Sequence, residues 1–175
     1  MTGKKKGVIK GKTEKIIKKE KKNIDPIFVG IDPSFSGSGV IVLDKDGEII
    51  EEKLITTDSK QSVEERLIDI REQLSFIPVI VNLKSIYFEG PSYSSNGQFA
   101  LQMGALHFMI RMMFFESKVE YKIIAPGTLK KFVTGKGNAK KDLMLLKVYK
   151  KWGVEFSDNN MSDAYGLARM ALEDK

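Results

Sequence analysis

The chain has 175 residues, a formal net charge of +6 and no cysteine. This length predicts one domain, and a hydrophobic content of 42% is enough for a sizeable core. The lack of cysteine excludes disulfide bonds and cysteine zinc sites. The sequence contains no run of about 18 apolar residues, so no membrane-spanning helix is predicted.

The positive charge is concentrated in two blocks. Residues 1–25 carry ten lysines against three acidic residues, and residues 118–151 carry ten lysines against two. Segregated charge favours a polyanionic partner such as DNA, although lysines that only keep a surface soluble give a similar pattern. Because residues 1–25 also lack aromatic side chains, we expect them to be a flexible basic arm before a domain that spans residues 26–175. A short amphipathic helix around Ile16 and Ile17, or a vector-derived segment, would fit the same residues.

The domain opens with the pattern of three strands joined by tight connections. Strands are predicted at residues 26–32, 39–43 and 48–56, where apolar residues run together or alternate with polar ones. Residues 44–47, with the sequence Asp-Lys-Asp-Gly, are typical of a hairpin turn. The second and third strands are therefore expected to pair antiparallel.

Helices then alternate with strands. Ser62 and Glu65 have the spacing of a capping box, which predicts a helix beginning there. Asp158 or Asn159 is expected to cap the final helix. Between them the pattern predicts strands at residues 84–89 and 120–125 and helices at residues 98–115, 128–132 and 138–152, the last of these capped by Asn138.

This order of elements predicts an α/β fold. Strands joined by hairpins pair antiparallel, whereas strands joined through a helix pair parallel. The expected architecture is a mixed five-stranded sheet, with three antiparallel hairpin strands followed by two parallel strands, flanked by helices.

Three acidic residues stand at positions suited to one shared site. Asp32 and Glu89 each end an apolar strand, and Asp163 lies near the start of the last helix. Carboxylates are costly to bury without a positive partner, and divalent cations prefer oxygen ligands. The pattern predicts a divalent metal site of a nuclease.

Five segments in a fixed order resemble a known family. They are Gly30-Ile31-Asp32-Pro33, Tyr87-Phe88-Glu89, residues 96–105, the lysine-bearing residues 125–141, and Asp163-Ala164 with the following Leu167-Ala168. The set resembles the ribonuclease-H-like nucleases and, more narrowly, the RuvC-type Holliday junction resolvases of the phage kind. The resemblance covers about residues 27–172.

The resemblance implies a metal-dependent endonuclease that cuts branched DNA, above all four-way junctions, by paired phosphodiester hydrolysis. It implies two Mg²⁺ ions per site, with Mn²⁺ possible, held by Asp32, Glu89, Asn160 and Asp163. It further implies a homodimer joined through the helix at residues 98–115, with no membrane partner and no small-molecule cofactor. The expected location is the cytoplasm, that of a bacterial host if a phage encodes the chain.

The same resemblance assigns roles to side chains that face DNA. Lys141 is expected near the scissile phosphate, where it would stabilise the transition state. The expected DNA-binding residues are Lys130, Lys131, Lys136, Lys140 and Tyr93. Each lysine could instead be a solvated surface charge, and Tyr93 could instead pack on its own loop.

The chain departs from the family pattern at one position. The family has a fourth acidic ligand three residues before the last aspartate, where this chain has Asn160. We favour Asn160 as a neutral oxygen ligand, because residues three apart on a helix share a face. Asp158 could reach the metal only from a loop before the helix. An inactivating substitution is the third interpretation.

Other functions and roles fit parts of the same sequence pattern. A catalytically weak or silent protein that binds DNA structures, or another nuclease of the ribonuclease-H-like group, could share these motifs. Sugar kinases and actin-like ATPases share the core fold but are far longer chains. His107, the single histidine, is predicted to be a packing residue of an apolar helix rather than a catalytic base.

Overall fold

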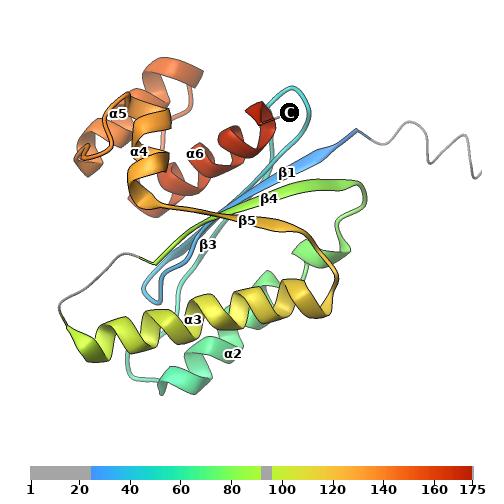
Figure 1. The fold of residues 1–175 in the computed structure, drawn as a ribbon, viewed down its shortest axis with the longest axis vertical. Helices are drawn as coiled ribbons and strands as arrows, with labels where there is room; N and C mark the ends of the chain where they lie inside the picture. Colours follow the sequence, from blue (N-terminus) through green and yellow to red (C-terminus); the bar gives the residue numbers. More distant parts are fainter. Residues whose placement is uncertain (1–24, 92–95, 175) are drawn as a thin grey trace, which may run out of the picture.

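A five-stranded mixed sheet lies at the centre of the fold, in the strand order β3-β2-β1-β4-β5 (Figure 1). The computed structural model describes residues 25–91 and 96–174. β1 pairs antiparallel with β2 and β2 with β3, whereas β4 pairs parallel with both β1 and β5. This pairing confirms the predicted sheet. The strands are β1 (Ile27–Asp32), β2 (Ser38–Leu43), β3 (Ile49–Ile55), β4 (Leu83–Glu89) and β5 (Tyr121–Ile124).

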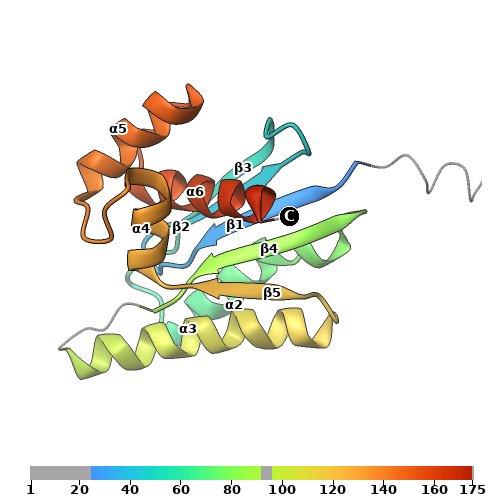
Figure 2. The ribbon, with the colours of Figure 1, turned by 45° about the horizontal axis from the view of Figure 1, so that its top comes forward.

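Helices cover both faces of the sheet, as Figure 2 shows. Helices α2 (Val63–Leu74) and α3 (Gly97–Glu116) lie on one face, with the short 3₁₀ helix η1 (Ile77–Val79) after α2. Helices α4 (Pro126–Thr134), α5 (Lys141–Trp152) and α6 (Asn159–Glu173) lie on the other. Each face has its own buried apolar cluster.

Alternation along β1 and β4 decides which face receives which side chain. Phe28 and Tyr87 belong to the apolar cluster under α6, whereas Ile31 and Phe88 belong to the cluster over α2 and α3. Because successive strand residues point to opposite faces, Asp32 and Glu89 point to the α6 face at the ends of their strands.

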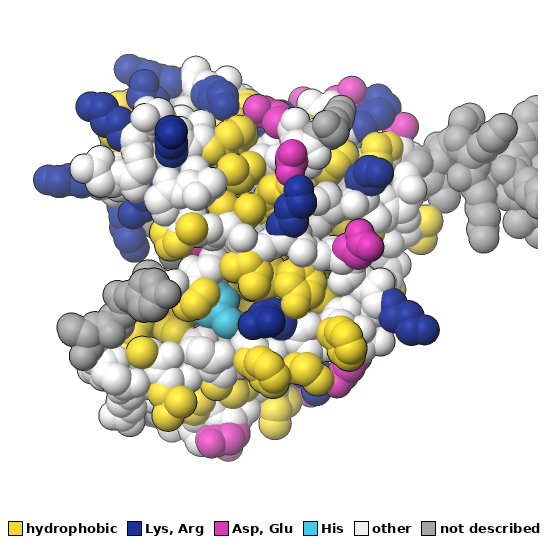
Figure 3. All heavy atoms as spheres, viewed as in Figure 1, with side chains coloured by type: hydrophobic (Ala, Val, Ile, Leu, Met, Phe, Trp, Pro, Cys, Tyr) yellow, Lys and Arg dark blue, Asp and Glu magenta, His cyan; other side chains and the backbone are white. Residues whose placement is uncertain are grey.

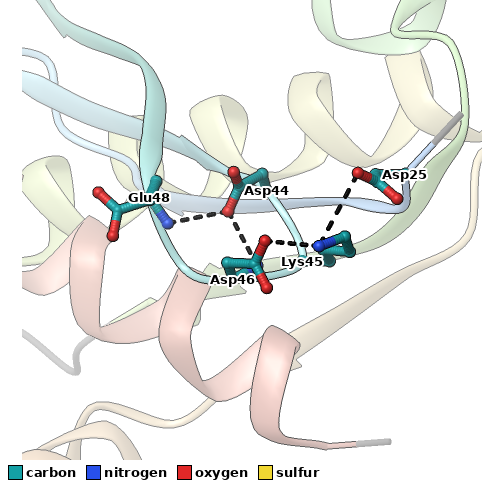
Figure 4. A network of polar contacts seen from close by, with 5 residues as sticks. All are labelled: Asp25, Asp44, Lys45, Asp46 and Glu48. Carbon is teal, nitrogen blue, oxygen red and sulfur yellow. Dashed lines mark hydrogen bonds and ion pairs between the residues drawn. The ribbon is translucent and has the colours of Figure 1, made fainter.

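The predicted hairpin between β2 and β3 is present, and Figure 4 shows the polar contacts of its turn. One carboxylate oxygen of Asp44 accepts the backbone N–H groups of Asp46 and Glu48, both at 2.9 Å. Gly47 has a φ of +85°, which glycine adopts without the penalty that a Cβ would bring. Lys45 forms exposed ion pairs with Asp46 and Asp25.

The helix ends confirm some predicted caps and correct others. Ser62 and Glu65 form the predicted capping box, and Asp158 caps α6 by accepting the N–H groups of Asn160 and Met161. The prediction that Asn138 caps a helix was wrong, because α5 begins at Lys141. Lys140 occupies the N-cap position, and its side chain makes no capping hydrogen bond.

The remaining differences concern helix α4 and the ends of the chain. The predicted short helix at residues 128–132 is longer, since α4 begins at Pro126, where a missing N–H costs nothing in the first helical turn. The predicted basic arm lies outside the described residues apart from Asp25. Within the described part, no helix combines the length and the apolar character that crossing a membrane requires.

Candidate active site

Sheet topology brings Asp32 and Glu89 together. Each ends its strand, and β1 and β4 are parallel neighbours in which Ile31 pairs with Phe88. The carboxyl ends of both strands therefore meet at the same edge of the sheet. Ligand oxygens of Asp32, Glu89 and Asp163 lie within 4.8 Å of one another, so three residues spread over 132 positions of sequence form one acidic cluster.

Two glycines let helix α6 bring Asp163 to that edge. A Cβ at Gly30 would lie 2.0 Å from the backbone oxygen of Ala164, and a Cβ at Gly39 would lie 2.2 Å from that of Asn160. Any side chain at either position would therefore push α6 away from the sheet. Gly30 and Gly39 therefore make room for the helix.

The acidic cluster is electrostatically costly in the absence of a cation. Burial raises the pKa of Asp32 well above its usual value, and the charge of Glu89 raises it further. Burial also raises the pKa of Glu89, and burial with the charge of Glu89 raises the pKa of Asp163 to about 7. Like charges this close resist joint ionisation unless something positive compensates them.

The donor set of this cluster fits a divalent cation. Asp163 has a buried carboxylate oxygen, Oδ1, with no hydrogen-bond partner. A buried acceptor without a partner is rare in folded proteins and calls for an explanation such as an ion. Carboxylate oxygens are the ligands that Mg²⁺ and Mn²⁺ prefer. The orphaned oxygen and the three converging carboxyl groups together fit a divalent metal site.

The structure separates the two candidates for a fourth ligand. Asp158 uses its carboxylate to cap α6, which gives it a structural role outside the acidic cluster. Asn160 lines the same cavity as the three acids, and its amide Nδ2 donates a hydrogen bond of 2.5 Å to the carbonyl of Gly37. Because the nitrogen is engaged there, the carbonyl oxygen Oδ1 is the atom of Asn160 that remains available to a cation.

The cluster opens into a cavity of about 310 Å³. Lys130 of α4 and Lys141 at the start of α5 line it, and the charges of both lower the pKa values of Glu89 and Asp163. The other predicted DNA-binding lysines do not line it. Lys131, Lys136 and Lys140 are exposed on and after α4, on the side of the molecule where Figure 3 shows lysine and arginine side chains gathered. Tyr93 lies outside the described residues.

One wall of the cavity was missed by the sequence interpretation. Phe99, Met103 and His107 of α3 line the same cavity as the acids. His107 does pack in the core as predicted, since its ring stacks on Phe88 with centroids 6.1 Å apart. Burial, aided by the charge of Arg111, lowers its pKa to about 4, so the ring is neutral at ordinary pH. The four-residue spacing of Phe99, Met103 and His107 indicates that they share one face of the helix. Because α3 is apolar on several faces, the sequence does not show which face borders the cavity.

Helix α3 also carries apolar side chains on its outer surface. Phe108 and Phe115 are 60% and 74% exposed, and Met112 between them and Ile123 of β5 are exposed as well. Figure 3 shows hydrophobic side chains gathered across this part of the surface. Exposed apolar residues gathered on one helix make this surface a candidate interaction site.

Comparison with known sequences shows a consistent likeness. The family model described as crossover junction endodeoxyribonuclease RuvC matches residues 28–169. The protein of that name from Rickettsia conorii is 26% identical over 154 residues, which cover 85% of this chain and 98% of the relative. The one from Brachyspira hyodysenteriae is 26% identical over 145 residues, covering 81% and 91%.

Solved structures share the fold. Thermus thermophilus RuvC in complex with a Holliday junction substrate superposes with a TM-score of 0.69 at 18% identity, over 82% of this chain and 90% of that one. The yeast mitochondrial Holliday junction resolvase superposes with a TM-score of 0.59 at 15% identity, over 91% and 84%. The ribonuclease-H-like fold predicted from the sequence is thereby confirmed.

Proposed function

The chain belongs to the RuvC family, and from this premise we propose that it is a crossover junction endodeoxyribonuclease, which resolves Holliday junctions and related branched DNA by paired phosphodiester hydrolysis. The observation that carries the proposal is the cluster of Asp32, Glu89 and Asp163 within 4.8 Å at the base of a cavity that also holds Lys130 and Lys141. Because its substrate is DNA, we propose that it works in the cytoplasm, that of a bacterial host if a phage encodes the chain.

The acidic cluster would hold two Mg²⁺ or Mn²⁺ ions. Asp32 is the buried member of the cluster, and the charges of both Glu89 and Asp163 raise its pKa, so Asp32 is the residue that we assign to serving both ions. Glu89, Asp163 and the Oδ1 of Asn160 would complete the protein ligands. When bound, such ions supply a water of lowered pKa and neutralise charge on the phosphate and the leaving oxygen.

The two cavity lysines perform a separate task. They lie beside a cluster of carboxylates that would otherwise repel the DNA backbone, and their charge already reaches Glu89 and Asp163. Lys141 begins α5 and is exposed, so its ammonium group can meet a phosphate entering the cavity. We assign Lys141 to the scissile phosphate and Lys130 to holding the strand, with Lys131, Lys136 and Lys140 binding DNA farther out.

A homodimer would supply the two symmetric cuts that junction resolution needs. The exposed apolar band of α3 and β5, defined by Phe108, Met112, Phe115 and Ile123, is the surface best suited to join two copies. A two-fold interface uses the same patch on both subunits, and it would place two acidic cavities in symmetric positions on one junction.

A second function stays open because of Asn160. With an amide in place of a fourth carboxylate, the cluster carries one negative charge fewer than the family pattern. A chain that binds junctions but holds its metal ions too weakly to cut would have the same fold and the same basic surface.

One assay separates the two functions. The protein is incubated with a four-way junction, a linear duplex and an RNA–DNA hybrid, each with Mg²⁺, Mn²⁺ or EDTA. We expect paired nicks on opposite strands of the junction that require metal. Glu89→Gln should abolish them, whereas Glu64→Gln, the matched change on the exposed surface of α2, should not. Junction binding without cleavage in either metal would favour the silent binder.

A further inference from the structure

We propose that the groove between strand β3 and the loop before α6 docks the lysine-rich segment of residues 12–22 of this same chain. This basic segment lies outside the described residues. The inference goes beyond the nuclease function and does not depend on it. It gives a role to a second hollow, which borders the first turn of α6 as the catalytic cavity does but contains none of the acids of that cavity.

The groove has a volume of about 290 Å³ and a mixed lining. Its residues come from β3, from the loop of residues 155–158 and from α6. The apolar ones are Leu54, Phe156 and Met161, and the acidic ones are Glu52, Glu155 and Asp158. Leu54 pairs with Gly39, over which the backbone of α6 passes, yet Leu54 is 42% exposed. Because β3 is the last strand on its side of the sheet, the groove is an apolar surface left open at the sheet edge.

The acidic side chains of the groove lack a positive partner. No lysine or arginine lines the groove, and neither Glu52 nor Glu155 forms an ion pair with a described residue. Such a groove repels DNA phosphates. It does not suit a metal ion either, since within the described residues three acids converge closely only in the catalytic cluster. Its ligand should therefore be an organic cation with apolar side chains.

The basic segment has this chemistry. Residues 12–22 carry six lysines against two glutamates, and the apolar pair Ile16-Ile17 stands between Lys15 and Lys18. The isoleucines match the apolar lining of the groove, and the flanking lysines match its carboxylates. Complementary charge around an apolar contact is the usual pattern of peptide recognition in a groove.

The chain leaves the described domain within reach of the groove. Asp25, the first described residue, lies 4.0 Å from the Nζ of Lys45 in the turn before β3, as Figure 4 shows. From Ile49 at the start of β3 to Leu54 the strand rises by about 17 Å. The eight peptide steps from Ile17 to Asp25 span up to about 26–29 Å when extended. The apolar pair can therefore reach Leu54.

Covalent attachment favours this segment over an unattached peptide. Exposed charge pairs are individually weak and are screened by salt, so the groove alone would bind a free basic peptide poorly. A segment joined by a short linker is present at an effective concentration of about millimolar. Docking should accordingly be lost at high salt. A junction should also displace the segment, because DNA phosphates compete for its lysines.

Disulfide trapping in the full-length chain tests the docking, because the chain has no native cysteine. Thr13→Cys is combined with Ser157→Cys, an exposed position in the groove, or with the exposed control Ser117→Cys. Ser117 lies shortly before β5, and β1, β4 and β5 run parallel, so Ser117 and Asp25 lie at the same end of the sheet. At low salt we expect the disulfide within one chain to form at least about tenfold faster with Ser157→Cys.

Charge reversal then tests why the disulfide forms. Adding Glu52→Lys and Glu155→Lys should lower the trapping rate to that of the Ser117→Cys control. Adding Glu64→Lys and Glu72→Lys, the matched changes on exposed positions of α2, should leave the rate unchanged. Salt at about 1 M should slow trapping in the groove as much as the first pair of changes does.

Hydrogen exchange of the wild type gives a second readout that needs no substitution. The backbone amides of residues 154–157 should exchange several-fold more slowly at low salt than in about 1 M NaCl, because the docked segment covers them. The amides of the exposed loop at residues 58–61 should exchange alike in both.

Three results would overturn the proposal. Equal trapping at Ser157 and Ser117 would show that the segment does not prefer the groove, and exchange independent of salt would show that nothing covers it. A disulfide between two chains would assign the groove to a second copy of the protein. A melting temperature of each variant shows whether it is folded, and the exchange of the wild type decides if a variant is not. None of these results bears on junction cleavage.

Discussion

The two sides of the cavity differ in their charge and in the elements that supply their residues. Asp32, Glu89 and Asp163 come from β1, β4 and α6, and burial and mutual repulsion raise their pKa values. Phe99, Met103 and His107 come from one helix and carry no charge at ordinary pH. The acidic side is thus electrostatically unfavourable without a cation, whereas the α3 side has no charge for a cation to compensate. The difference teaches that a bound cation should change the free energy of the acidic side and leave that of the α3 side unchanged.

The largest expected effect separates activity from stability on the acidic side. Asp163→Asn should lower the cleavage rate by on the order of 10³-fold or more, as removal of one member of a catalytic unit does. The same change should leave the melting temperature in EDTA unchanged or higher, because it removes a repelled, partly buried carboxylate. A lower melting temperature in EDTA would show that the cluster is not strained.

The next effect concerns the lysine beside the acids. Lys141→Ala should lower the single-turnover rate by about 10²–10³-fold, the usual loss when one transition-state charge partner is removed. Junction affinity should fall far less, because Lys131, Lys136 and Lys140 remain. Lys60→Ala, on an exposed loop before α2, is the control. Equal losses in rate and affinity would instead assign Lys141 to DNA binding alone.

A smaller effect tests the neutral position. Asn160→Asp should lower the melting temperature in EDTA, because a carboxylate cannot donate to the carbonyl of Gly37 as the amide does. Loss of a hydrogen bond worth about 1 kcal/mol corresponds to roughly 2–4 °C at this chain length. Mg²⁺ should then raise the melting temperature more than in the wild type.

The control for that change is Asn138→Asp, which adds the same charge at an exposed position between α4 and α5. If Asn160→Asp is as stable as the wild type without metal, the contact with Gly37 contributes nothing. If Mg²⁺ raises the melting temperatures of Asn160→Asp and of the wild type equally, the side chain at position 160 is not a ligand.

The smallest effect is a pH dependence. The pKa of Asp163 is raised to about 7 from an ordinary 3.8, so the folded protein binds more protons than the unfolded chain between these values. Stability without metal should therefore fall as pH rises from about 4 to 7. In EDTA, the difference in melting temperature between Asp163→Asn and the wild type should grow over this range. A difference independent of pH would contradict the raised pKa.

Metal should reverse that trend. Cations and protons compete for the same carboxylate oxygens, so the stabilisation that Mg²⁺ brings should increase as pH rises through about 7. The charge of the α3 wall should not change as pH rises through about 7, because His107, with a pKa near 4, remains neutral.

Much of the fold and of the acidic site could be predicted from local patterns. A few neighbouring residues are enough to recognise the apolar runs that end in Asp32 and Glu89. The same is true of the capping box at Ser62. Topology then follows, because strands joined through helices pair parallel and their carboxyl ends meet. Asn138 failed as a predicted cap for a local reason too, since Lys140 and not Asn138 directly precedes the helix.

Some features depend on contacts between segments far apart in the chain. Gly30 and Gly39 are small because the backbone of α6 passes over them, and the amide of Asn160 bonds to Gly37, 123 positions away. His107 became a cavity residue only because α3 packs under the sheet with that side chain beside the acids. Sequence alone determined which residues end strands and begin helices, since backbone preferences and side-chain alternation are local. Tertiary structure alone decided which side chains share one cavity, because packing sets distances between segments that no sequence spacing encodes.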